Sequence, residues 1–286
     1  MSIWRIGEAT IHRVLEFEGP LIAPRILLPD STEAGIDRHR SWLEPDLLDR
    51  ATGDLVLAFH SLIIRTPRHT VLVDTCGGND KHRPQKPRYH QKDHPYLANL
   101  DAAGFRPEDI DFVLCTHMHV DHVGWNTMLV DGKWQPTFPN ARYLMGRVEF
   151  EHWNAVDVDS TKQIMSDSVL PVFDAGLVDL VETDHKICDE VSLIPTVGHS
   201  PGHVTVLIQS QGEEGMITGD FIHHPCQFAH PEWSASPDTD PEQARRTRHE
   251  VFSRYADTPM LIIGTHFHTP TAGHLKRDGD VYRLEV

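Results

Sequence analysis

Apolar and polar side chains alternate along several stretches of the chain, a pattern typical of β-strands with one buried face. Residues 3–17 alternate in this way and predict a pair of strands at the edge of a sheet. Further strands are expected over residues 55–66, 70–74, 112–115, 141–145, 191–196, 203–209, 216–218 and 260–263. Helices are expected over residues 96–103, 147–156, 164–180 and 241–255. Two runs of strands, each followed by helices, indicate a mixed α/β fold.

Residues 18–50 interrupt this alternation. Their apolar side chains are broken up by Gly19-Pro20, Pro24 and Pro29, and a short helical piece is expected around Trp42. An apolar excursion before the main sheet can form a lid or a wall of a substrate pocket, or it can form the contact of a homodimer. The sequence leaves both open, within a chain that we expect to fold as one domain over residues 1–286.

Four strong metal ligands fall within six positions directly after the apolar run 112–115, where the sequence reads Thr116-His117-Met118-His119-Val120-Asp121-His122. After a strand, His117 and His119 point the same way, while Asp121 and His122 can face a second point nearby. Imidazole and carboxylate suit zinc, and two ions roughly 3.5–4 Å apart are a known arrangement for hydrolysis. The 21 histidines of the chain produce some clusters by chance. The spacing H-x-H-x-D-H directly after a strand is much more specific than a chance cluster of histidines.

The composition limits the classes of partner. The formal charge of −16 disfavours nucleic acid and anionic membrane surfaces, because both require a basic footprint. The four cysteines are widely separated, so neither a zinc knuckle nor a disulfide framework is predicted. No apolar run approaches the roughly 18 residues of a membrane span, and no signal peptide pattern follows Met1. We therefore expect a cytoplasmic protein that acts on a small molecule.

The chain resembles the metallo-β-lactamase-fold hydrolases, on motifs that extend from Asp74 to His266. Members of this superfamily carry H-x-H-x-D-H, followed by a later His, a later Asp and a last His. The matching positions are His199 in Gly198-His199-Ser200-Pro201-Gly202-His203, Asp220 in Thr218-Gly219-Asp220, and His266 in Gly264-Thr265-His266. The resemblance implies a four-layer αββα sandwich with the metal site at one rim of the sheets.

The resemblance also implies two divalent metal ions. By position, the first ion would be held by His117, His119 and His199, the second by Asp121, His122 and His266, and Asp220 would bridge them. Zinc is the expected metal, with manganese, iron or cobalt as alternatives. A water shared by two such ions loses a proton near neutral pH and becomes the nucleophile. Asp74 would support the ligands without binding metal, and His203 is expected to have a structural role.

The residue at the bridging position narrows the resemblance. Several true β-lactamases carry a cysteine there, whereas Asp220 suits lactonases, glyoxalase II-type thioesterases and phosphotriesterases. Residues 219–228, followed by Trp233, look most like the branch of methyl parathion hydrolase and related lactonases and esterases. Quorum-quenching lactonases have a tyrosine three positions after the bridging aspartate, where this chain has His223. Histidine can also donate a hydrogen bond to a substrate carbonyl. We therefore predict His223 as a catalytic residue, together with Asp121 and Asp220 of the ligand set.

Further residues are candidates for the surroundings of the site. Phe228, Trp233 and His268 are predicted to line the substrate pocket, together with the apolar segment 21–28. Residues 79–96 carry five lysines and arginines, and we expect them to form a solvated loop. A gate for anionic substrates is the alternative for this loop.

These features predict a metal-dependent hydrolase that cleaves a lactone or another carboxylic ester. Phosphotriester hydrolysis is the first alternative, because the same centre can stabilise a trigonal bipyramid. Thioester cleavage of the glyoxalase II type comes next, although the sequence shows no basic C-terminal helix for a glutathione carboxylate. A flavodiiron redox protein would need a flavin domain, and a nuclease of this fold would need a basic track; the sequence provides neither.

Overall fold

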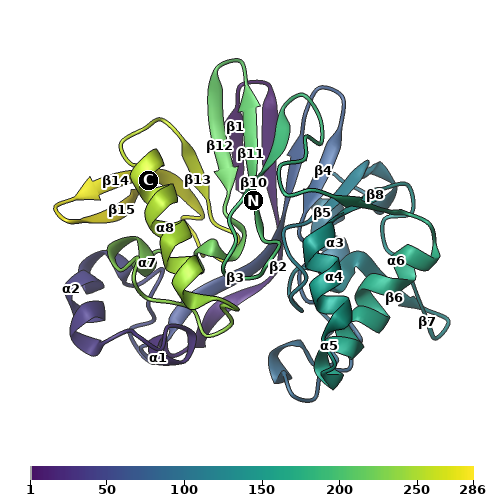
Figure 1. Cartoon of the computed structure of the whole chain (residues 1–286), viewed down its shortest axis with the longest axis horizontal. Coiled ribbons are helices and arrows are strands. Elements are labelled where there is room, and N and C mark those ends of the chain that lie inside the picture. Colours follow the sequence, from purple (N-terminus) through teal and green to yellow (C-terminus); the bar gives the residue numbers. More distant parts are fainter. Residues whose placement is uncertain (1) are drawn as a thin grey trace.

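The computed structural model describes residues 2–286 and contains two large β-sheets that pack face to face (Figure 1). The first sheet has the strand order β1-β2-β3-β4-β5-β8-β9, and the second runs in order from β10 to β15. The strands of the first sheet are β1 (Ile3–Ile6), β2 (Ala9–Ile22), β3 (Leu55–Arg65), β4 (Thr70–Val73), β5 (Phe112–Cys115), β8 (Arg142–Gly146) and β9 (Val178–Val181). Those of the second are β10 (Val191–Pro195), β11 (Val204–Ser210), β12 (Glu213–Ile217), β13 (Leu261–Ile263), β14 (Ala272–Asp278) and β15 (Val281–Glu285). A small ribbon pairs β6 (Thr127–Val130) with β7 (Lys133–Pro136).

Helices lie on the outer faces of both sheets, with α3 to α6 at one side and α7 and α8 at the other (Figure 1). They are α1 (Pro24–Leu27), α2 (Glu33–Leu43), α3 (Tyr96–Ala102), α4 (Arg147–Ala155), α5 (Asp159–Ile164), α6 (Leu170–Asp174), α7 (Cys226–Ala229) and α8 (Pro241–Tyr255). One apolar cluster fills the space between the sheets, a second joins the first sheet to α3, α5 and α6, and a third joins the second sheet to α7 and α8. The expected four-layer αββα sandwich is therefore confirmed.

Strand β3 shows how the sequence determines this architecture. Its near-continuous apolar run is buried on both faces from Leu55 to Ile64, as expected for a central strand that is covered on both sides. Its neighbour β4 runs parallel to β5, and in the second sheet β12 runs parallel to β13. The carboxyl ends of these strands meet at one rim of the sandwich, and the polar segments that follow them come together there.

Several elements differ from the sequence prediction. Strand β2 continues through Gly19-Pro20 to Ile22, beyond the predicted end at residue 17, with register shifts near both ends of this extension. The helix predicted over residues 164–180 ends at Asp174, because Gly176 has φ +70° and the next residues pair with β8 as β9. Strands β14 and β15 had no counterpart in the prediction.

The N-terminal excursion packs against its own chain. Helix α2 contacts α7, and the backbone N–H of Ser236 donates to the carbonyl of Leu27 at 2.7 Å. Leu27 also lines the cavity that is described below, so the excursion supplies part of its wall. Its role as a movable lid or as a dimer contact stays a prediction.

The basic loop over residues 79–96 is not simply solvated, and that prediction was wrong for two of its cations. Lys81 and Arg83 are fully buried, at 0 % and 2 % exposure. The Arg83 guanidinium donates to both carboxylate oxygens of Asp167 at 2.6 Å, and the Lys81 ammonium lies 3.8 Å from the same carboxylate. The loop is thereby tied to the π-helical segment Met165–Val169 between α5 and α6.

Candidate metal centre

Ligand-type side chains converge at the rim of the sandwich from both sheets. Residues 117–122 follow β5 of the first sheet, and the other three candidates follow strands of the second. His199 follows β10, Asp220 lies in a 3₁₀ turn after β12, and His266 follows β13. The structure thus brings all seven predicted metal ligands to one place from four separate connections.

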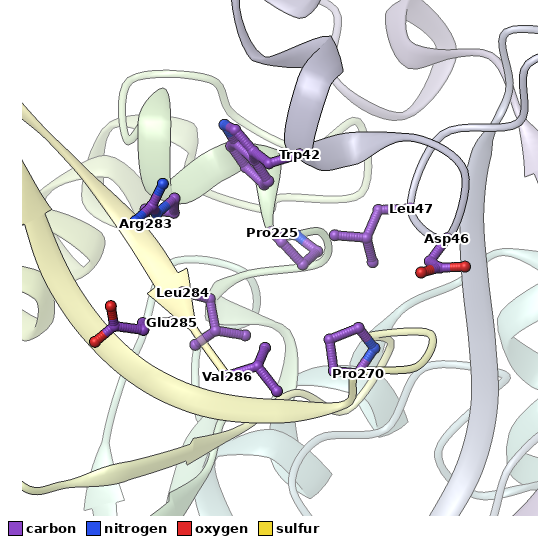
Figure 2. Close-up of a pocket in the computed structure, with 9 residues that line it drawn as sticks. All are labelled: Trp42, Asp46, Leu47, Pro225, Pro270, Arg283, Leu284, Glu285 and Val286. Atoms are coloured by element: carbon purple, nitrogen blue, oxygen red, sulfur yellow. The ribbon is translucent and has the colours of Figure 1, made fainter.

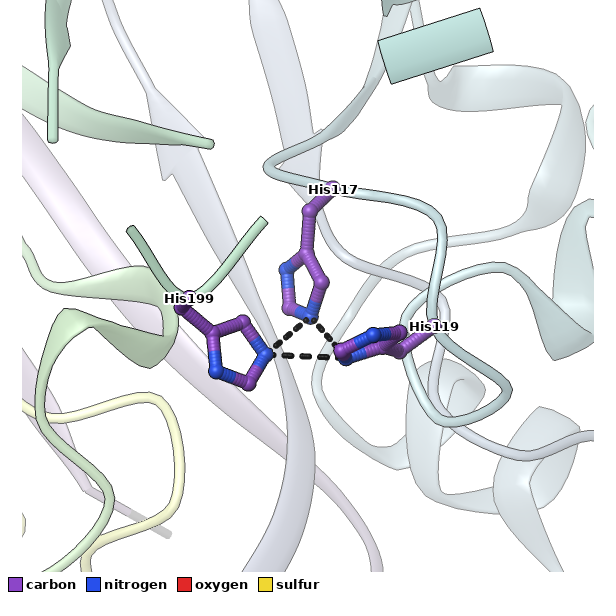
Figure 3. Close-up of side chains that lie close together, drawn as sticks. All are labelled: His117, His119 and His199. Carbon is purple, nitrogen blue, oxygen red and sulfur yellow. Dashed lines mark hydrogen bonds between the residues drawn. The ribbon is translucent and has the colours of Figure 1, made fainter. Parts of the chain in front are cut away.

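Three imidazoles face one another in the first group (Figure 3). Nε2 of His117 lies 3.1 Å from Nδ1 of His119 and 3.1 Å from Nε2 of His199. The third side of this triangle, from His199 Nε2 to His119 Nδ1, is 2.8 Å. Three nitrogens directed at one point match the donor set that binds a zinc ion from three sides.

The second group consists of Asp121, His122 and His266, whose ligand atoms lie within 4.8 Å of one another. Asp220 lies between the two groups. Its Oδ2 is 3.3 Å from Nε2 of His122 and 3.6 Å from Nε2 of His199, while its Oδ1 is 3.2 Å from Nε2 of His266. One carboxylate therefore faces both groups, which is the placement that a bridging ligand requires.

The ring nitrogens on the far side of these imidazoles are held by hydrogen bonds. Nδ1 of His122 donates to Asp74 at 2.9 Å, and Nδ1 of His266 donates to the carbonyl of Ala58 at 3.1 Å. Nδ1 of His199 donates to Asp238 at 3.0 Å. With Nδ1 as the donor, Nε2 of each ring presents its lone pair inward.

Buried atoms without partners point into the same space. His122 Nε2 and Asp220 Oδ1 have no hydrogen-bond partner within the protein. Buried polar atoms are nearly always paired, and unpaired ones call for a water or an ion. The residues therefore fit divalent metal ions of the kind that nitrogen and oxygen ligands prefer.

Burial lowers the pKa of His117 and His199 well below the ordinary value, and it lowers the pKa of His119 to about 4. These three rings are consequently neutral at pH 7, the form that binds metal. Burial alone would also lower the pKa of His122, but the carboxylates of Asp220 and Asp74 raise it well above its usual range. The carboxylates around the second group thus stabilise a positive charge there.

The sequence model of the metallo-beta-lactamase superfamily matches residues 60–266, more than half of the chain. The chain belongs to this superfamily. Among curated proteins it is 28% identical over 118 residues to an N-acyl homoserine lactonase of Bacillus cereus, which covers 41% of this chain and 40% of the relative. It is 27% identical over 172 residues to the N-acyl homoserine lactonase AttM of Rhizobium radiobacter, covering 54% and 61%. The match thus spans less than two thirds of these relatives.

Two solved structures share the fold over nearly the whole chain. The hydrolase AbOPH of the beta lactamase superfamily superposes with a TM-score of 0.81 at 23% identity, covering 99% of this chain and 95% of that one. AidC, a dizinc quorum-quenching lactonase in complex with a product, superposes with a TM-score of 0.81 at 21% identity, covering 99% and 96%. At these identities the likeness establishes the fold.

A cavity of about 410 Å³ opens directly above the superfamily motif. Its floor includes Asp121, Asp220 and His266, and its apolar wall includes Phe59 and Trp153. This volume lies within the range of pockets for small molecules. The ligand cluster is thus open to a compound of that size.

His223 lies at the floor of this cavity, three residues after Asp220. Its Nε2 is 3.2 Å from Oδ2 of Asp220, and neither of its ring nitrogens has a hydrogen-bond partner within the protein. His199, His223 and Asp238 also place ligand-type atoms within 4.8 Å of one another. His223 therefore presents unused hydrogen-bonding capacity beside the metal ligands.

The three residues that were predicted to line the pocket lie elsewhere. Phe228 is buried in the third apolar cluster against Phe252, and Trp233 stacks on His230 at 3.7 Å between ring centroids. His268 points toward Glu18, with Nε2 at 3.7 Å from its carboxylate. None of the three lines the 410 Å³ cavity. Phe228 and Trp233 are close to the metal ligands in sequence, but their rings pack against other aromatic side chains and do not face the cavity.

His203 has the structural role that was predicted. Its Nε2 accepts a hydrogen bond from the backbone N–H of Asp220 at 2.7 Å, and its Nδ1 donates to the carbonyl of Thr196 at 3.0 Å. Gly219 has φ +58°, and a Cβ there would lie 2.5 Å from Nε2 of His203. Glycine is therefore required directly before Asp220.

Sequence reasoning missed three residues that contact the ligands or their loops. The phenol of Tyr89 donates to Oδ2 of Asp121 at 2.9 Å, and Asp238 accepts from His199. Glu149 is buried and accepts from the backbone of Met118 and of Gly202, so it joins the two histidine loops of the first group. No spacing in the sequence connects these residues to the ligands, because each comes from a distant segment.

A separate hollow of about 290 Å³ lies between α2 and β15, lined by Trp42, Leu47, Pro225 and Val286 among others (Figure 2). Figure 2 shows mainly apolar side chains and no histidine among its lining residues. None of the metal-type clusters found within residues 2–286 borders it. The cavity at the superfamily motif is therefore the candidate active site.

Proposed function

We propose that this chain is a dinuclear metal-dependent hydrolase that cleaves a lactone or another carboxylic ester. The observation that carries the proposal is the convergence of seven ligand-type side chains at one rim of the sandwich, where four of them line a cavity of about 410 Å³, namely His119, Asp121, Asp220 and His266. His117, His119 and His199 would hold one ion, and Asp121, His122 and His266 would hold the other, with Asp220 between them. Two divalent ions at these positions would polarise the ester carbonyl and lower the pKa of water.

In the proposed reaction, water adds its oxygen to the acyl carbon, the acyl C–O bond breaks, and the leaving alkoxide takes a proton. No serine or cysteine nucleophile is needed. His223 would donate a hydrogen bond to the carbonyl oxygen, where negative charge develops in the transition state. Asp121, whose carboxylate lies at the cavity surface, would pass the proton from water toward the leaving oxygen.

The choice of lactones and esters is supported by the relatives. Those in the Bacillus species and in Rhizobium are N-acyl homoserine lactonases. The apolar wall of the cavity, with Leu27, Phe59 and Trp153, suits an acyl chain. An N-acyl homoserine lactone is therefore the first substrate to try, beside simpler lactones and aryl esters.

The test is an activity panel with the chain loaded with zinc, manganese or cobalt. The panel holds an N-acyl homoserine lactone, a γ-lactone, an aryl ester, a thioester and a phosphotriester. Asp220→Asn is the active-site variant, and Asp101→Asn, in an exposed position on α3, is the matched control. Metal content is measured by atomic emission in all three proteins.

Ester or lactone turnover that falls more than about 100-fold in Asp220→Asn, and is retained in Asp101→Asn, would support the proposal. Phosphotriester turnover well above that of the esters would replace it with the alternative predicted from the sequence. Two bound metals with no turnover of any ester or lactone would contradict the substrate class.

A further inference from the structure

Two cations line the cavity without a carboxylate partner. Lys86 and Arg88 lie on either side of Pro87, around the 3₁₀ turn Pro87–Tyr89, and both line the cavity above the ligand cluster. Within residues 2–286, no other lysine or arginine lines it. The chain as a whole carries a net charge of −16, so these two cations place positive charge at the cavity of an otherwise acidic protein.

The basic loop over residues 79–96 contains both buried cations that are paired with a carboxylate and cations that have no such partner. Lys81 and Arg83 are buried and balanced by Asp167, as described above. Over the described residues, neither Lys86 nor Arg88 has a carboxylate within 4.0 Å. Lys86 is exposed. The Arg88 guanidinium donates to the carbonyl of Leu21 at 2.6 Å and also interacts with the Tyr89 hydroxyl, and it has no carboxylate partner. These two charges are available to a ligand.

The turn that carries them is fixed relative to the metal ligands. Tyr89 follows Arg88 directly, and its phenol donates to Asp121 at 2.9 Å. On the other side, Arg83 holds the start of the loop on Asp167. A molecule bound at the metal ligands would therefore meet positive charge that is already held in place at the cavity.

We propose that Lys86 and Arg88 form an anion subsite, so that the preferred ester or lactone carries a carboxylate on the part of the molecule remote from the scissile bond. This inference rests on the proposed ester hydrolysis and names its substrate class. The reacting carbonyl would lie at the ligand cluster, the intervening chain along Phe59 and Trp153, and the remote carboxylate at the guanidinium and ammonium.

The test compares two aryl esters that differ only at the remote end. In p-nitrophenyl hexanoate the acyl chain ends in a methyl group, and in mono-p-nitrophenyl adipate the same six-carbon chain ends in a carboxylate. The ratio of their kcat/KM values is measured for the metal-loaded chain, for Lys86→Gln and for Lys86→Gln combined with Arg88→Gln. Lys92→Gln is the control, because it removes an equal charge from the same loop outside the cavity.

We expect the ratio to favour the adipate ester at least about fivefold at low salt, to fall by roughly two- to fivefold for each cation removed, and to persist in Lys92→Gln. A wild-type ratio near one, or a ratio that survives in the double variant, would overturn the subsite. Lys86 is exposed, so the single variant keeps the test valid if the double variant misfolds.

A second measurement separates this inference from the proposed function. Calorimetric titration compares adipate with hexanoate, the two product acids, on the metal-loaded proteins. If neither ester is hydrolysed, ester hydrolysis fails. The subsite still predicts that adipate binds at least about fivefold more tightly than hexanoate, and that this advantage falls by roughly two- to fivefold in Lys86→Gln. Equal binding of the two acids would refute the subsite in either case.

Discussion

The carboxylate of Asp74 accepts a hydrogen bond from Nδ1 of His122 at 2.9 Å, and this contact is buried. The same carboxylate accepts from the backbone and the hydroxyl of Thr116, the residue directly before the histidine motif. Asp74 itself has φ +57°, a strained backbone conformation for a residue other than glycine. Asp74 therefore orients His122 and anchors the start of the ligand loop.

Asp74→Asn should weaken metal binding at the second group by about 10- to 100-fold, because the neutral amide no longer raises the basicity of His122. Competition with a chromogenic chelator measures this affinity. Asp101→Asn serves as the control for the loss of one negative charge. An unchanged affinity in Asp74→Asn would mean that Asp74 only holds the backbone.

His223→Phe should lower kcat/KM on the best ester by roughly 100-fold, because the ring that could donate to the carbonyl oxygen is removed. His223→Tyr should retain activity to within about tenfold, since the phenol can supply the same donor. Metal content should be equal in both variants and in the unsubstituted chain. A loss of metal in His223→Phe would instead assign His223, with His199 and Asp238, to metal binding.

Asp167→Asn should destabilise the chain by about 3–5 kcal/mol in urea unfolding, because it leaves the buried guanidinium of Arg83 without its counter-ion. The chain offers a matched control in Asp179→Asn, which breaks a similar two-bond pair with Arg142 at the surface. That pair is 39% and 48% exposed, so its loss should cost less than about 1 kcal/mol. Equal effects would show that Asp167 is not an anchor.

The lowered pKa of Lys81 predicts that the free energy of unfolding rises with pH. Burial lowers the pKa of its ammonium from 10.5 to about 7, although Asp167 acts in the opposite direction. Between pH 7 and pH 10.5 the unfolded chain holds this proton and the folded chain does not, so stability increases as the pH rises. Below pH 7 both states are protonated, and the contribution is constant.

The difference between the chain and Lys81→Met isolates this contribution. The free energy of unfolding of the chain, relative to that of Lys81→Met, should increase from pH 7 to pH 9. The same comparison with Lys92→Met, from a partly exposed position, should stay flat. A flat difference for Lys81→Met would mean that Lys81 keeps its proton in the fold.

The central part of the site could be predicted because its signals are local. Residues 117–122 directly follow β5, and His199, Asp220 and His266 each follow a strand whose apolar run is visible in the sequence. Strand ends converge at one rim of a sandwich, so a resemblance based on these short motifs placed all seven side chains in one region. The charge of −16 also disfavours nucleic acid and anionic membranes as partners, which stays a prediction.

Only the tertiary structure decided how the surroundings of the site are built, because burial depends on partners that are distant in sequence. Lys81 and Arg83 are inside because Asp167 lies opposite them, more than 80 residues along the chain. Phe228 and Trp233 pack away from the cavity, while Lys86, Arg88 and Tyr89 border it. Local patterns specify strands and ligand spacing, whereas the cavity wall arises from long-range packing that no single segment encodes.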